Sequence, residues 1–237
     1  MSIEARHITV NGMRIEIVRK AIKNLHLGVY PPHGSVRVAA PLAVSDDAVR
    51  LAVITRLSWI KRKQAGFKGQ DRQSPRAYVS GESHYFFGRR YRLAVVEHSG
   101  AGRVAVKNAK TLTLNIRPNS DTVQRERVVL AWYRKELRGA AGPLIEKWAK
   151  IIGVPVPQWR IKKMKTKWGS CSIAAQRIWL NLELAKKAPQ CLEYIVVHEM
   201  SHFHERHHND RFVKLMDKHL PNWRSIRDEL NVAPLGV

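Results

Sequence analysis

The chain has 237 residues, enough for one large domain or two small ones. Hydrophobic residues make up 44% of it, so a packed core is expected and wholesale disorder is excluded. It has no apolar run that could cross a bilayer and no signal-peptide pattern, so we expect a cytoplasmic location and no membrane partner. The net charge of +23 predicts an anionic binding partner, such as nucleic acid, nucleotides or an acidic surface.

Residues 1–118 are predicted to form a β-rich N-terminal part with one helix. Apolar residues alternate with polar ones up to about residue 41, which predicts an antiparallel sheet of about four strands. Asn11-Gly12 is a two-residue hairpin turn within it. Ser45 caps the helix, whose apolar stripe runs to Ile60. A linker is expected at 71–77, followed by a second β stretch to about 117.

Residues 119–237 are predicted to form the second part. A long helix runs from Thr122 to about Ile152, and Gly139 and Gly142-Pro143 predict a kink or break inside it. Two strands follow, near 159–164 and 178–182, with a turn or bulge between them. Pro189 then opens a further helix, at the first-turn position that proline favours. Strand runs mixed with helices in this way predict the α+β class.

The residues His198-Glu199-Met200-Ser201-His202 form an H-E-x-x-H motif on that helix. Positions four apart lie on one helical face, so the two imidazoles can bind one Zn²⁺. Glu199 between them can hold the metal-bound water and take its proton. The alternative is a surface helix with solvated histidines, and a chance match is expected in roughly 3 of 100 chains of this composition.

A catalytic zinc usually keeps three protein ligands and one open position. The third ligand could be His207, His208 or a carboxylate further on, of which Asp217, Asp228 and Glu229 have suitable spacing. We prefer His208, because the polar run 205–210 is where the helix could break and return a side chain to the metal. Three imidazoles and a water suit Zn²⁺, but also Ni²⁺ or Co²⁺.

A longer set of residues resembles the YgjP-like metallopeptidase family, which is related to the SprT and WLM zinc peptidases. The set is Lys167-Trp168-Gly169-Ser170-Cys171-Ser172, Ile178-Trp179-Leu180-Asn181, Pro189, the H-E-x-x-H motif, His208-Asn209 and Phe212. The resemblance covers roughly residues 20–230. It departs from the family pattern at Lys167, where arginine is usual, at His207, where asparagine often precedes the third ligand, and at Val213, where tryptophan is common.

The resemblance implies that His198, His202 and His208 are the zinc ligands and that Glu199 is the catalytic acid/base. It implies a zincin-like catalytic part at 119–237 that acts on protein or peptide substrates. The segment Trp168–Ser172 is expected to be the wall that holds the substrate backbone, or else a tight bulge needed for packing.

Two alternative functions remain open. The same metal site could hydrolyse nucleotide phosphoanhydride bonds, since the positive charge and the basic run at 160–167 suit phosphates. It could also belong to a protease that acts on proteins bound to nucleic acid, in which case binding should weaken steeply with salt.

Overall fold

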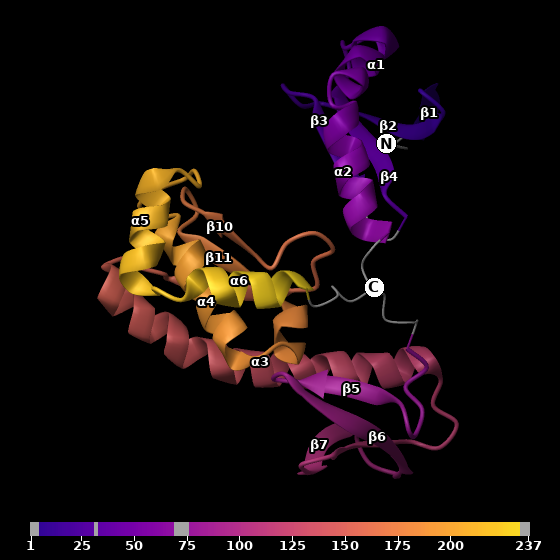
Figure 1. Ribbon diagram of the computed structural model, residues 1–237. Helices are drawn as coiled ribbons and strands as arrows, with labels where there is room; N and C mark the ends of the chain where they lie inside the picture. The colour runs from indigo at the N-terminus through magenta and orange to yellow at the C-terminus, as the bar shows by residue number, and fades with distance from the viewer. Residues whose placement is uncertain (1–4, 31–32, 69–75, 233–237) are drawn as a thin grey trace. The chain divides into compact units, whose positions relative to one another are not determined.

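The computed structural model describes residues 5–30, 33–68 and 76–232 (Figure 1). Contacts within the chain divide it into two compact units, with the division between residues 72 and 73. The sequence placed the boundary at 118 instead. The two differ because residues 76–118 share one apolar core with the helices of the C-terminal part. Most of the expected linker, 71–77, lies outside the described residues.

The first unit begins with a four-stranded sheet in the order β1-β2-β4-β3. Its strands are β1 (Ala5–Val10), β2 (Met13–Lys20), β3 (His26–Tyr30) and β4 (Ser35–Pro41). The predicted hairpin turn is confirmed: Asn11 and Gly12 have φ of 50° and 77°, and Val10 pairs with Met13. The prediction of a purely antiparallel sheet is wrong, because the inner strands β2 and β4 are parallel. Alternation places the same residues on the core face in either orientation, so the sequence could not distinguish them.

Two helices, α1 (Asp46–Ile54) and α2 (Leu57–Lys68), follow this sheet. The expected cap is present, since the Ser45 hydroxyl accepts a hydrogen bond from the Ala48 N–H at 3.2 Å. A single helix was expected, but the chain turns at Thr55-Arg56 between the two. Their buried residues, Val49, Val53 and Ile60, share a core with the sheet residues Ile15 and Val38.

The second unit begins with a sheet of the same design. Its strands are β5 (Ser83–Phe86), β6 (Arg89–Glu97), β7 (Arg103–Asn108) and β8 (Thr111–Ile116). Their order is β5-β6-β8-β7, and again the inner pair is parallel while the outer pairs are antiparallel. The strand topology of the first unit is therefore repeated, although no repeat is visible in the sequence.

The long helix α3 (Thr122–Ile152) connects this sheet to the rest of the unit. Asp121 and Gln124 form a capping box at its start, and Gly153, with φ of 74°, ends it. The expected break does not occur, and the helix runs through Pro143. A stripe buried along its whole length, from Val129 to Ile152, holds the two halves on the same core.

The C-terminal part adds a three-stranded sheet and three helices after α3 (Figure 1). The strands β9 (Gln158–Lys162), β10 (Gly169–Ser172) and β11 (Arg177–Asn181) are arranged β10-β11-β9, and a short 3₁₀ turn, η1 (Leu182–Lys186), follows them. The helices are α4 (Pro189–Ser201), α5 (Asp210–His219) and α6 (Trp223–Val232). The mixed helix and strand content confirms the α+β class.

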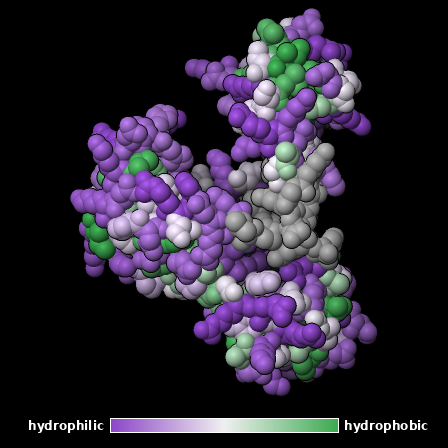
Figure 2. Space-filling model, in the orientation of Figure 1, coloured by the Kyte–Doolittle hydropathy of each residue, from purple (hydrophilic) through white to green (hydrophobic). Residues whose placement is uncertain are grey.

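The described surface is strongly polar, as Figure 2 shows for the face it presents. This agrees with the 42 Lys and Arg residues of the chain against 19 Asp and Glu. Among the described residues, no helix is both long and apolar enough to span a membrane.

Asn181 at the end of β11 fixes the loop that leads into β10. Its side chain is fully buried, and its Nδ2 donates to the carbonyls of Met164 at 2.9 Å and Lys167 at 2.7 Å. Its Oδ1 accepts from the Met164 N–H at 3.2 Å. Its backbone N–H donates to the Trp168 carbonyl at 2.8 Å. One side chain therefore places the whole segment before Gly169.

Replacing Asn181 by Ala should lower the free energy of unfolding by roughly 2–4 kcal/mol, since buried backbone groups lose their partners. Urea denaturation of the full chain measures this. Asn108→Ala is the matched control, because its exposed side chain makes one hydrogen bond in a turn, to the Lys110 N–H. Equal stabilities for the two variants would contradict the anchoring role of Asn181.

Candidate functional site

The helix α4 forms the back of the site. Pro189 occupies its first turn, and most of its residues from Cys191 to Ser201 are buried. Buried Ser201 ends the helix, and its hydroxyl donates to the Val197 carbonyl at 2.8 Å. His202 is the C-cap, so the two motif histidines lie at the last turn of the helix. The prediction that the chain leaves the helix before His208 is confirmed.

The chain turns back after α4 and brings a third histidine to the first two. The His208 Nε2 lies 3.1 Å from the Nε2 atoms of both His198 and His202. A tetrahedral zinc with Zn–N bonds of about 2.0–2.1 Å separates two nitrogen ligands by roughly 3.4 Å. The three histidines therefore form a group that could hold a metal ion.

The surroundings orient the three rings. His202 Nδ1 donates to the Glu205 carbonyl at 3.0 Å, which leaves its Nε2 as the free lone pair. Phe212 is buried beneath the cluster, with its ring centroid 4.7–5.0 Å from those of the three histidines. Asn209 caps α5 by accepting from the Phe212 N–H at 3.1 Å, so the helix holds Phe212 under the rings.

Burial also favours the neutral imidazoles that bind metals. Together with the neighbouring His202 and His208 rings, it lowers the pKa of His198 to about 3. Burial likewise lowers the pKa of His202, although the hydrogen bond to Glu205 opposes this. The donor set, three uncharged nitrogens at a tetrahedral spacing, fits a divalent ion of the zinc type.

Glu199 is 5% exposed and projects into the same site. Burial raises the pKa of its carboxyl to about 8, against the opposing effect of the Lys167 ammonium. Gly169 packs directly on it: a Cβ at residue 169 would lie 2.5 Å from the Glu199 Oε1. Any side chain at residue 169 would therefore displace the Glu199 carboxyl from its present position.

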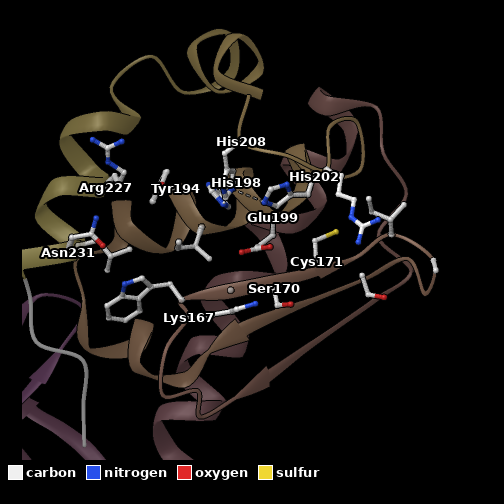
Figure 3. Close-up of a pocket in the computed structure, with 18 residues that line it drawn as sticks. Lys167, Ser170, Cys171, Tyr194, His198, Glu199, His202, His208, Arg227 and Asn231 are labelled. Atoms are coloured by element: carbon white, nitrogen blue, oxygen red, sulfur yellow. Dashed lines mark hydrogen bonds between the residues drawn. The ribbon is translucent and has the colours of Figure 1, made fainter. Parts of the chain in front are cut away.

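Strand β10 forms the opposite wall, as Figure 3 shows. It is an edge strand that pairs with β11 on one side, so its other edge faces the site. The cleft between β10 and α4 has a volume of about 1010 Å³. Cys171 lines it, and burial together with the Glu199 charge raises the pKa of its thiol to about 11. Of its lining residues, the sequence pointed to the three histidines His198, His202 and His208, to Glu199 and to segment 167–172.

The other candidate ligands lie elsewhere. His207 is outside the three-histidine group. Asp217 accepts hydrogen bonds from Trp223 Nε1 at 2.8 Å and from Arg224. Asp228 pairs with Arg227, and Glu229 accepts from Gln190. His204 Nε2 donates to the Ile152 carbonyl at 3.0 Å.

Sequence reasoning missed the part of the cleft made by Tyr194 and by α6, which adds Arg227, Leu230 and Asn231. Tyr194 sits one turn before His198, with its ring edge-on to that histidine at 5.7 Å. The spacing of four residues between Tyr194 and His198 could have indicated that Tyr194 lines the cleft. The α6 residues carry no such signal, because which face of a short amphipathic helix meets the cleft is decided by packing alone.

Comparison with known proteins identifies the family to which the chain belongs. Its sequence matches the YgjP-like, metallopeptidase domain family over residues 23–233. No curated protein matches it. Similar solved structures include the metallopeptidase zymogen of Pyrococcus abyssi abylysin, 23% identical, which aligns over 38% of this chain and 90% of that one with a TM-score of 0.36. The zymogen of Methanocaldococcus jannaschii jannalysin is 20% identical, with 38% and 87% covered and a TM-score of 0.36.

At these TM-scores the assignment rests on the sequence match, which confirms the resemblance described above. Because that match covers most of the chain, the protein belongs to the YgjP-like metallopeptidase family and is a metal-dependent hydrolase.

Proposed function

We propose that the protein is a zinc-dependent metallopeptidase in which His198, His202 and His208 hold the metal and Glu199 is the general acid/base. One observation carries the proposal: three imidazole nitrogens converge beside a buried carboxylate in an open cleft. Three neutral nitrogen ligands leave one position of a tetrahedral ion open, as in catalytic zinc sites. Nickel or cobalt would fit the same donors.

When bound, the ion supplies Lewis-acid chemistry, which makes water more acidic and polarises the bond under attack. Glu199 accepts a proton from the attacking water and returns it to the leaving amine. Its burial beside the three histidines places its carboxyl where it can exchange protons with water in the cleft. The Gly169 backbone presses on its carboxyl and keeps it in the cleft.

The free edge of β10 is the proposed binding site for the substrate backbone. An extended peptide can pair with the unpaired N–H and C=O groups of an edge strand, and the cleft then holds its side chains. Gly169 packs directly on Glu199, so a peptide paired with the edge of β10 passes beside the proposed acid/base. The loop anchored by Asn181 keeps the strand at that distance.

The hydrolysis of nucleotide phosphoanhydride bonds is the second candidate. The observation that favours it is the presence of three cationic side chains in the cleft lining, Lys167, Arg206 and Arg227. Cations at this position suit phosphates as well as carboxylates. The nucleic-acid-associated alternative stays a prediction based on net charge.

His208→Ala should lower the affinity for zinc by at least about tenfold, because the site loses one of three protein ligands. Competition with a chromogenic chelator measures this directly. His207→Ala is the control, since it removes the neighbouring histidine from outside the cluster. If His207→Ala weakened zinc binding as much as His208→Ala does, the assignment of the third ligand would be wrong.

Glu199→Gln should retain stoichiometric zinc and lower kcat by about 10²-fold or more, since general acid/base catalysis is lost. Zinc is measured by atomic absorption, and turnover with casein and with a panel of nucleoside triphosphates, each with and without chelator. Full activity of the variant would refute the mechanism. Chelator-sensitive turnover of nucleotides without any peptide cleavage would favour the second candidate.

Gly169→Ala should lower kcat while the zinc content stays unchanged, because the new methyl group displaces the Glu199 carboxyl. The expected loss is on the order of 10²-fold, comparable with loss of the acid/base. Gly139→Ala is the matched control, since a Cβ there meets no atom within 4 Å on helix α3. Wild-type kcat for Gly169→Ala would show that the contact is unimportant for catalysis.

A further inference from the structure

We propose that this cleft selects acidic polypeptides, with Arg206 and Arg227 binding substrate carboxylates on opposite sides of the cleaved bond. The inference rests on the proposed peptidase function and adds its substrate class. It comes from the charge of the cleft lining and from where the two arginines stand along helix α4.

The cleft is lined by more cationic than acidic side chains. Lys167, Arg206 and Arg227 are cations, and the acid among the lining residues is the buried Glu199. A substrate side chain entering the cleft therefore meets positive charge on several sides. Carboxylates gain from this field, while lysine and arginine side chains are repelled.

The two arginines flank the histidine cluster. Tyr194, His198 and His202 follow each other at intervals of one turn along α4. The Arg227 charge acts on Tyr194, so Arg227 lies at the Tyr194 end, and Figure 3 shows it there on α6. Arg206 directly follows Glu205, whose carbonyl accepts from His202 Nδ1 at 3.0 Å, so Arg206 lies at the His202 end of the cluster. The distance from Tyr194 to His202 is about 12 Å along the axis, which roughly four residues of an extended chain span.

Each arginine is available for a ligand. Arg227 pairs with its neighbour Asp228 at 2.9 Å, but the two side chains are 43% and 66% exposed, and such solvent-accessible pairs are weak. Its guanidinium also lies over the Trp223 ring at 5.2 Å, which fixes its position beside the cleft. Arg206 is exposed on the turn that precedes His208. A peptide rather than a compact anion is favoured because the two cations stand on both sides of the cluster, along a free strand edge.

The experiment uses the zinc-loaded full chain and peptides that share one cleavable bond. Acidic, neutral or basic residues are placed two positions away, on its N-terminal side, its C-terminal side or both. Acidic peptides should have a kcat/KM about tenfold above that of basic ones, since each exposed pair contributes up to roughly fivefold. The advantage should shrink as salt is raised.

Charge-reversal variants show which arginine acts on which side of the cleaved bond. Arg206→Glu should remove the acidic preference on one side of the bond, and Arg227→Glu should remove it on the other. Lys214→Glu is the control, because it changes the net charge equally from an exposed position on α5 outside the cleft. Thermal unfolding and zinc content verify that each variant is folded and loaded.

The outcomes separate the two proposals. Equal rates for acidic and basic peptides, or loss of the preference on the same side in both arginine variants, would overturn the selection of acidic substrates while leaving a peptidase. An equal effect of Lys214→Glu would also overturn it, because net charge alone would then explain the preference. If the zinc-loaded protein cleaves no peptide but hydrolyses nucleotides, the proposed function fails, and this inference fails with it.

Discussion

The close approach between the Gly169 backbone and the Glu199 carboxyl sets the geometry of the whole site. It fixes how near strand β10 comes to helix α4, and that separation determines the width of the cleft. Other parts of the chain hold both Gly169 and Glu199 in position. Asn181 binds the loop that leads into Gly169, and the buried face of α4 holds Glu199 against the core shared with α3. The Glu199 carboxyl group is thus buried between two segments of backbone that other contacts hold in place.

The chemistry of the site was predictable because it depends on short sequence distances. Two histidines one helical turn apart must share a face, and His208 is close enough to return after a break. The preference for His208 over His207 and the carboxylates agrees with the cluster found in the structure. The cations that line the cleft were not predictable as a set. Lys167, Arg206 and Arg227 come from a loop, a turn and α6, and only tertiary packing brings such residues together.

The individual strands and helices were predictable from the sequence, but strand directions, helix breaks and packing partners were less so. The alternation of Ile15 and Ile17 identified strand β2, but the same alternation suits parallel and antiparallel neighbours. The break between α1 and α2 at Thr55-Arg56 carries no glycine or proline, so nothing in the sequence marks it. The predicted boundary at 118 differs from the contact-based division, because composition does not show that the sheet of strands β5–β8 packs on helix α3.

The turn between α4 and α5 is held at both ends by hydrogen bonds within the chain. The His202 ring donates to the Glu205 carbonyl inside the turn, and the Asn209 side chain caps the helix that follows. The arrangement of the three histidines therefore depends on hydrogen bonds made by Glu205 and Asn209, neither of which belongs to the cluster. Loss of the Asn209 cap would free the start of α5 and with it Phe212, on which all three rings pack. The spacing of the imidazole nitrogens is thus controlled in part by a residue that contributes no nitrogen to the group.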